Sequence, residues 1–229
     1  MSGLRPLGPR GPVAVGYAPT MATEPPPTPV VPSRIETARC VLRPYEVSDG
    51  PALHAAVNTS LAELRPWLPW TDWHPDVAAS TETCRRLRAA FEARADFTLG
   101  IFDRADGRLL GGTGLHRVKW ELPSFEIGYW LRTDAVGRGI VTETTAALVR
   151  TCFEALGAVR VELITDPRNA RSGSVAERVG FQLEGTLRCG MLGTDRRPAD
   201  RRVWGLTRDD WARERARIIA LATGTPPPA

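Results

Sequence analysis

The pattern of apolar and polar positions along the chain predicts a run of strands and helices in one folded unit. Phe125–Leu131 is rich in aromatic residues and alternates with the period of a strand. From Ile140 onward the apolar residues recur with the spacing of a helix face. Gly157 then marks a helix stop. In chain order we expect strands at Arg39–Tyr45, Phe97–Asp103, Leu109–Arg117, Phe125–Leu131, Arg160–Asp166, Phe181–Met191 and Arg201–Leu206, and helices at Asp49–Asn58, Ala78–Ala95, from Ile140, at Ser172–Val179 and at Asp209–Leu221.

The two ends of the chain differ from this folded unit. Residues 1–32 contain nine prolines and little apolar periodicity, so they cannot bury enough surface to offset the entropy of ordering. We expect a disordered or polyproline arm at 1–32, with a docking arm for a partner as the alternative and Met21 as an alternative start. Residues 223–229 contain three consecutive prolines and are expected to form a frayed, disordered tail. The folded domain is therefore expected at 33–222.

Composition excludes several classes of protein. The 229 residues are 42% hydrophobic and 24% charged, which suits one well-filled domain. The net charge of +4 is spread out, and basic pairs such as Arg85-Arg86 are interrupted by acids, unlike a nucleic-acid-binding pattern. No apolar run reaches the roughly 18 residues of a membrane span, and the first residues lack a signal-peptide core.

The cysteines predict neither a metal site nor a disulfide framework. Cys40, Cys84, Cys152 and Cys189 are scattered and form no C-x-x-C pair. We expect reduced, buried thiols in a cytoplasmic protein, and no metal cofactor.

A glycine turn stands between the strand at Phe125–Leu131 and the helix that follows. Gly137-Arg138-Gly139 lets the backbone curl, and free amides at a helix start bind phosphate groups well. A plain strand-to-helix turn is the alternative. A dinucleotide fingerprint is excluded because Thr142 stands where the third glycine should be, and the G-K-[ST] of a P-loop occurs nowhere. Gly111–Gly114 is interpreted as a bend in a strand.

A second segment, Asn169–Gly185, carries further motifs that must be considered together with the glycine turn. The ordered motifs E-I-G-Y-W-L, G-R-G-I-V-T-E, N-x-x-S, E-R-V-G-F and L-E-G-T-L-R resemble the GNAT superfamily of acetyl-CoA-dependent N-acetyltransferases, and most of all its RimJ/RimL branch. The resemblance covers Arg34 to Trp211. It implies an α+β fold with a mixed, mostly antiparallel sheet of six or seven strands flanked by helices. It also implies that the fourth and fifth strands splay apart to admit acetyl-CoA.

The same resemblance suggests the cofactor site. The turn and the helix start, residues 137–142, would bind the pyrophosphate, and Asn169 would bind the pantetheine arm. Backbone N–H groups near Tyr129 to Leu131 would stabilise the oxyanion. One departure is visible: the family usually has Gln or Arg three residues before the first glycine, where this chain has Asp134. The predicted cofactor-binding set is Tyr129, Trp130, Leu131, Gly137, Arg138, Gly139, Ile140, Val141, Thr142, Asn169 and Ser172.

Acetyl transfer to an amine also needs a base. An amine with a pKa of roughly 8 to 10 is mostly protonated at neutral pH, so a carboxylate must take its proton directly or through water. Glu126 is our candidate, because it shares a strand face with Gly128 and Trp130 and matches the position of a glutamate base in several GNAT enzymes. An ion-paired surface glutamate is the alternative role, and Asp72 and Glu121 are weaker candidate bases.

A proton for the departing thiolate is the last requirement. Many GNAT enzymes use a tyrosine where this chain has Ala176, and its tyrosines are Tyr17, Tyr45 and Tyr129. The serine of N-x-x-S, Ser172, is therefore the candidate acid, with a helix N-cap as its favoured structural role.

Aromatic residues in the segment after the first helix predict the acceptor pocket. We expect Trp67 to be buried and Trp70 or Trp73 to line the site, with Asp72 and His74 beside them. His116 is placed among the substrate-binding residues, although His116 and His54 are interpreted as structural rather than catalytic histidines.

The predicted acceptor is a protein N-terminal amine like that of a ribosomal protein. A small amine such as a polyamine, an antibiotic or an aminoacyl compound is one alternative, and a catalytically silent cofactor-sensing or interaction module is the other. Association with the ribosome and a homodimer are left open as partners, and no membrane partner is expected.

Overall fold

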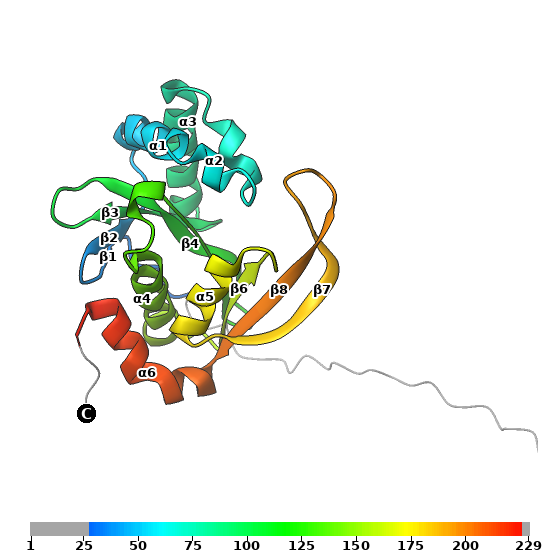
Figure 1. The fold of residues 1–229 in the computed structure, drawn as a ribbon. Helices are drawn as coiled ribbons and strands as arrows, with labels where there is room; N and C mark the ends of the chain where they lie inside the picture. The colour runs from blue at the N-terminus through cyan, green and yellow to red at the C-terminus, as the bar shows by residue number, and fades with distance from the viewer. Residues whose placement is uncertain (1–27, 226–229) are drawn as a thin grey trace, which may run out of the picture.

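The computed structural model describes residues 28–225, which form one mixed sheet covered by helices on both faces (Figure 1). Its eight strands follow the order β1-β2-β3-β4-β5-β6-β8-β7. The strands are β1 (Ile35–Glu36), β2 (Cys40–Arg43), β3 (Phe97–Asp103), β4 (Leu109–Lys119), β5 (Ser124–Leu131), β6 (Arg160–Thr165), β7 (Gln182–Leu192) and β8 (Pro198–Thr207). The α-helices are α1 (Gly50–Asn58), α2 (Leu61–Leu64), α3 (Val77–Glu92), α4 (Ile140–Glu154), α5 (Ala170–Val179) and α6 (Arg208–Thr223), and short 3-10 turns lie at Val47–Asp49, Pro69–Trp73 and Thr133–Ala135.

The two central strands of the sheet separate along part of their length. β5 and β6 are parallel, whereas the other neighbouring strands are antiparallel. Their pairing runs from Ser124 opposite Arg160 to Ile127 opposite Leu163 and then stops. On its other side β5 stays paired with β4 as far as Leu131. The second half of β5 therefore has one free edge, which confirms the predicted splay of the fourth and fifth strands.

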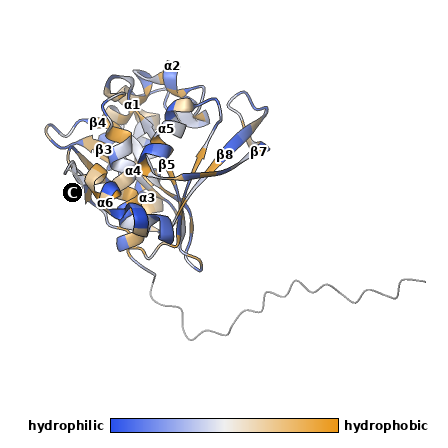
Figure 2. Cartoon of the chain, turned by 60° about the horizontal axis from the view of Figure 1, so that its bottom comes forward, coloured by the Kyte–Doolittle hydropathy of each residue, from blue (hydrophilic) through white to orange (hydrophobic). Residues whose placement is uncertain are grey.

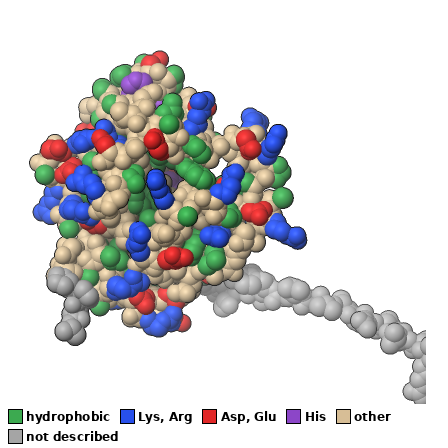
Figure 3. Space-filling view, in the orientation of Figure 1, with side chains coloured by type: hydrophobic (Ala, Val, Ile, Leu, Met, Phe, Trp, Pro, Cys, Tyr) green, Lys and Arg blue, Asp and Glu red, His purple; other side chains and the backbone are tan. Residues whose placement is uncertain are grey.

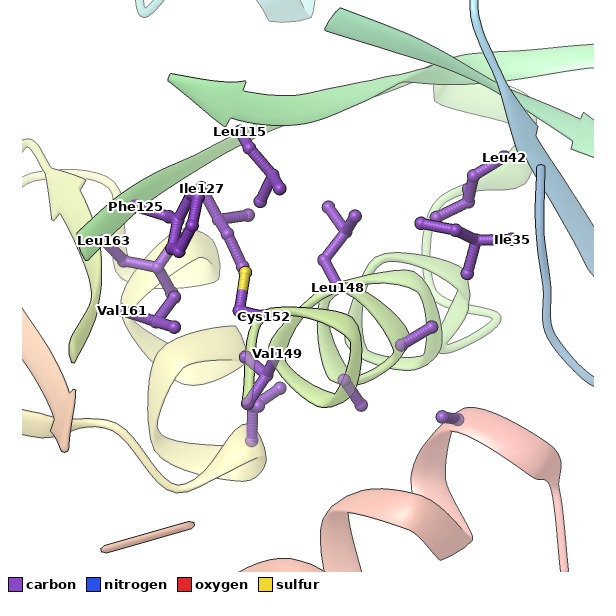
Figure 4. Packing of buried hydrophobic residues seen from close by; sticks show 14 of the residues in the cluster. Ile35, Leu42, Leu115, Phe125, Ile127, Leu148, Val149, Cys152, Val161 and Leu163 are labelled. Atoms are coloured by element: carbon purple, nitrogen blue, oxygen red, sulfur yellow. The ribbon is translucent and has the colours of Figure 1, made fainter. Parts of the chain in front are cut away.

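The helix α4 is the centre of the main core. Leu148 and Cys152 on α4 point toward Leu115, Phe125 and Ile127 of the sheet (Figure 4). Full burial of each such side chain contributes about 1.5–3 kcal/mol, so this interface holds α4 firmly against β5. The helix α6 packs on the other side of α4, and its outer surface is largely hydrophilic (Figure 2).

A second, smaller core lies between α1, α3 and the opposite face of the sheet, around Tyr45, Phe102 and Leu109. Together the two cores hold both faces of the sheet, so the opening beside β5 is built on a rigid frame. None of the helices within residues 28–225 is both long and apolar enough to cross a membrane.

The predicted α+β class and mixed sheet are confirmed, with eight strands instead of six or seven. The additional strand is β1, whose two residues are too few to show a period. The last strand, β8, begins at Pro198 rather than at Arg201 as expected, because its first positions are exposed or half-buried and give no apolar alternation. Most of the predicted arm, residues 1–27, lies outside the described residues, as do residues 226–229 of the predicted tail.

Three boundaries or burial states differ from the sequence prediction. Val31, within the predicted arm, is buried in the main core. The helix α6 continues through Thr223 and ends at Gly224, whose φ of 69° is typical of a helix C-terminal glycine. Cys189 is exposed on β7, while the other three cysteines are buried as predicted. Burial raises the pKa of the Cys84 thiol to about 12, so this group stays protonated and unreactive.

Candidate active site

A cavity of about 1790 Å³ opens where β5 and β6 separate. It is lined by the glycine turn before α4, by α5, by the segment from Glu63 to Pro69 and by the tip of the β7–β8 hairpin. Figure 3 shows Lys and Arg side chains gathered around the hollow on this face. Thr194 at the hairpin tip donates a hydrogen bond to the Pro66 carbonyl (3.2 Å), which joins two walls of the cavity.

The glycine turn forms one end of this cavity. Gly137 and Gly139 have φ values of 82° and 76°, in the left-handed region that favours glycine. The helix α4 begins at Ile140, directly after the turn, and its first N–H groups have no partner within the helix. The turn glycines and Ile140, Val141 and Thr142 line the cavity, whereas Arg138 is exposed and does not. The amides and the helix dipole together suit an anionic group.

Asp134 lies before the glycine turn, but its negative charge does not weaken the anion site. Its carboxylate pairs with Arg132 (3.1 Å) and with Arg108, and it does not line the cavity. Hydrogen bonds from Arg132, followed by those from Arg108, lower the pKa of Asp134 below its usual value. The negative charge is thus compensated locally by two guanidinium groups.

The free edge of β5 supplies backbone donors beside the turn. The Arg132 N–H donates to the Leu110 carbonyl on the β4 side (2.8 Å). Because donors alternate along an antiparallel strand, the N–H groups of Tyr129 and Leu131 point to the other side, into the opening. Tyr129, Trp130 and Leu131 all line the cavity. Two aligned N–H groups of this kind can stabilise an oxyanion.

The start of α5 closes the opening from the β6 side. Asn169 is the N-cap of α5, and its side-chain oxygen accepts a hydrogen bond from the Ser172 N–H (3.1 Å). The sequence analysis favoured Ser172 as the N-cap, and this prediction is wrong. Ser172 is a residue of the first turn of α5. The predicted helix began two residues too late, at Ser172 instead of Ala170, because Ala170 and Arg171 carry no apolar periodicity. Both Asn169 and Ser172 line the cavity.

Tyr129 connects the two sides of the opening. Its hydroxyl donates a hydrogen bond to the Ser172 carbonyl (3.2 Å). Burial raises the pKa of Tyr129 to about 12, so the phenol stays protonated at neutral pH. The sequence analysis placed the backbone N–H of Tyr129 in the site but not its hydroxyl, because Tyr129 is on a strand rather than on the helix that carries the family's tyrosine.

Glu126 lies just outside the cavity, two residues before Gly128 on β5. It shares a face with Gly128 and Trp130, which line the cavity, whereas Glu126 does not. Two residues of strand separate Glu126 from Gly128, roughly 7 Å. Its carboxylate is 3.5 Å from the Arg117 Nε and its side chain is 20% exposed. Glu126 is thus a half-buried, loosely ion-paired carboxylate near the floor of the opening.

The two weaker candidate bases lie outside the cavity. Asp72 is exposed and pairs with Arg65 (3.2 Å), and Glu121 is exposed. Neither lines the cavity.

The tryptophans are arranged differently from the prediction. Trp67 is half-buried and lines the cavity, whereas Trp70 packs edge-on against Trp130 (5.5 Å between ring centroids). Trp73 is 56% exposed and lies under Arg86, away from the cavity. The three tryptophans are spaced by three residues along an irregular link, so their directions depend on a 3-10 turn that the sequence pattern did not reveal.

The histidines have structural partners. The His116 Nδ1 is 2.7 Å from an Asp96 carboxylate oxygen, and His116 does not line the cavity. His74 is buried with its Nδ1 3.1 Å from the Ser80 hydroxyl. Within residues 28–225 no group of three or more His, Cys, Asp or Glu side chains could hold a metal ion.

Several lining residues were not identified from the sequence. The residues at issue are Arg39, Glu63, Leu68, Arg117, Ile164, Met191 and Arg201. Arg39 comes from the β1–β2 turn and Met191 and Arg201 come from the β7–β8 hairpin, whereas the others lie on α2, on the link after it, on β4 and on β6.

Comparisons with known proteins agree with this geometry. A family model described as "Acetyltransferase (GNAT) domain" matches residues 39–182. YdaF of Bacillus subtilis (strain 168) is 37% identical over 86 residues, which cover 38% of this chain and only about half, 47%, of YdaF. The "[Ribosomal protein uS5]-alanine N-acetyltransferase" of Escherichia coli (strain K12) is 24% identical over 180 residues, 78% of this chain and 92% of that protein. The structure of Mycobacterium smegmatis RimJ in complex with CoA-disulfide is similar with a TM-score of 0.68 and 27% identity, covering 77% of this chain and 87% of RimJ.

Proposed function

We propose that this chain, which belongs to the GNAT acetyltransferase domain family, transfers the acetyl group of acetyl-CoA to a primary amine. The observation that carries the proposal is the continuity of the cavity. It joins the amides of the glycine turn to the free N–H groups of Tyr129 and Leu131 through the opening of the sheet. A ligand with an anionic end and a thioester end fits such a site.

Cofactor binding is assigned to the turn and to α5. The pyrophosphate would contact the amides of Gly137 to Thr142, and the pantetheine arm would pass Asn169 and Ser172. The thioester carbonyl would then lie at the free edge of β5, between Tyr129 and Leu131. A solved relative of this fold, RimJ of Mycobacterium smegmatis, is in complex with a CoA disulfide, which supports a CoA site.

The reaction would proceed by direct attack of the amine. The amine nitrogen forms a bond to the thioester carbon, the carbonyl oxygen becomes an oxyanion held by backbone N–H groups, and the C–S bond breaks. The amine proton passes to Glu126, through water because Glu126 lies below the cavity floor. The thiolate of CoA takes a proton from Ser172 or from the Tyr129 hydroxyl.

Ser172→Ala is expected to separate these two acids. Because Asn169, not Ser172, caps α5, the substitution should leave the melting temperature nearly unchanged while kcat falls about tenfold or more. Steady-state kinetics and a thermal melt measure the two quantities. Wild-type turnover in Ser172→Ala, together with a large loss in Tyr129→Phe, would assign the proton to the tyrosine.

The acceptor is proposed to be a protein N-terminal amine, as in a ribosomal protein. The support is the name of the Escherichia coli relative, which acts on a ribosomal-protein alanine, and the shape of the acceptor side. Trp67, Leu68 and Met191 line this side, and the flat ring of Trp67 can bind an extended peptide at a low cost in entropy.

A screen of acceptors tests the assignment. Thiol release from acetyl-CoA would be measured with peptides of varied N-terminal residue, with polyamines and with aminoglycosides. The expected result is turnover with peptides that disappears when their N-terminus is blocked. Turnover restricted to small amines would replace the peptide acceptor, and binding of acetyl-CoA without turnover on any amine would favour the catalytically silent module.

A further inference from the structure

The turn between β1 and β2 reaches the cofactor end of the cavity from far along the sequence. Arg39 in this turn lines the cavity together with Gly137 and Gly139. Its Nη1 donates to the Arg138 carbonyl (2.8 Å). A Cβ added at Gly139 would lie 3.6 Å from the Arg39 Nη2, so the guanidinium group abuts the glycine turn.

Glu143 fixes this arginine in place. Its carboxylate, 5% exposed, accepts hydrogen bonds from the Arg39 Nε (2.7 Å), the Arg39 backbone N–H (2.8 Å) and the Thr37 hydroxyl (2.6 Å), and its Oε2 lies 2.7 Å from the Arg39 Nη2. A buried carboxylate held by this many donors is a rigid anchor. The anchor also determines which way the guanidinium group faces.

The arginine keeps donors free on its exposed side. A guanidinium group has five N–H donors, and the contacts of Nε, Nη1 and Nη2 use three of them. One N–H on each terminal nitrogen remains, and the side chain is 47% exposed. Two forked donors match the oxygens of a phosphate group.

Arg39 also balances the charge at the start of α4. Asp134, before the turn, is already compensated by Arg108 and Arg132. Glu143 is the acidic residue of the first turn of α4. Arg39 offsets Glu143 and presents positive charge on the side of the glycine turn that faces the cavity.

We propose that Arg39, positioned by Glu143, binds the pyrophosphate of acetyl-CoA beside the glycine turn. The proposal rests on the acetyl-CoA-dependent function above. Glu143 acts through Arg39 and is a positioning residue.

Calorimetric titration with CoA tests the proposal without any acceptor. Arg39→Gln is expected to raise the Kd of CoA about tenfold or more at low salt, because a charge-assisted contact is lost. The loss should shrink as salt rises, since the contact is exposed to screening. The same factor is expected with dephospho-CoA, which lacks the 3′-phosphate but keeps the pyrophosphate.

Arg104→Gln is the matched control. Arg104 contacts the same β1–β2 turn through Glu36 (3.5 Å) and the Thr37 carbonyl (3.4 Å) but does not line the cavity, so its loss should leave the Kd unchanged. Arg39→Lys keeps the charge with fewer donors and is expected to lose less affinity. If Arg39→Gln does not fold, the Kd of CoA for Arg39→Lys is the measurement that tests the proposal.

Three results would overturn the role of Arg39. These are an unchanged Kd for CoA, a loss that vanishes with dephospho-CoA, and a loss that does not depend on salt, which would indicate a deformed turn. A wild-type protein that binds no CoA would instead overturn the proposed function itself.

Discussion

Glu126→Gln is expected to lower kcat on the order of 10²–10⁴-fold while the affinity for acetyl-CoA stays nearly unchanged. The amide keeps the shape of the side chain, so the change removes the proton acceptor and little else. The loss should shrink as the pH rises, because an amine with a pKa of roughly 8 to 10 then loses its proton unaided. A pH profile of kcat with a peptide acceptor measures both effects.

Glu162→Gln is the control for this prediction. Glu162 is opposite Glu126 in the β5–β6 register, and its carboxylate is held by the Arg160 Nε at 2.6 Å. Because this carboxylate is already paired and Glu162 does not line the cavity, its loss should leave kcat close to that of the wild type. Wild-type turnover of Glu126→Gln at every pH would transfer the role to another group or to bulk water.

Gly139→Val is expected to abolish the binding of acetyl-CoA while the fold remains intact. Gly139 has a φ of 76°, which a β-branched residue adopts only with strain, so the turn should change its shape to relieve it. The amides would then no longer face one phosphate group. Calorimetry with acetyl-CoA measures the affinity, and circular dichroism with a thermal melt checks the fold.

Gly107→Val separates strain from binding. Gly107 has nearly the same φ, 74°, with nothing within 4 Å of an added Cβ, and it lies in the β3–β4 turn outside the cavity. It should therefore lose similar stability and keep its affinity for acetyl-CoA. Undiminished affinity in Gly139→Val would show that the glycine turn does not bind the pyrophosphate.

The parts of the site that follow from local sequence were predicted well. The glycines at 137 and 139, the strand at Phe125–Leu131 and the helix from Ile140 depend on residues within one turn or one strand period of each other. Backbone preference and apolar periodicity act over that distance, so the order of strand, turn and helix is determined by the sequence alone. The parallel neighbour of this strand, β6, was also placed by its own apolar pattern.

The parts that depend on distant residues required the tertiary structure. Arg39 and Glu143 are separated by 104 positions and form one ion-paired anchor, and the Tyr129 hydroxyl meets the Ser172 carbonyl across 43 positions. Trp67, rather than Trp70 or Trp73, lines the cavity because an irregular link turns it there. From the sequence, the negative charge of Asp134 was expected to reduce the attraction for the cofactor, whereas the structure shows that Arg108 and Arg132 compensate this charge. Periodicity and turn chemistry determine which elements form, whereas side-chain partners are determined by which elements the packed sheet brings together, and no local pattern records that choice.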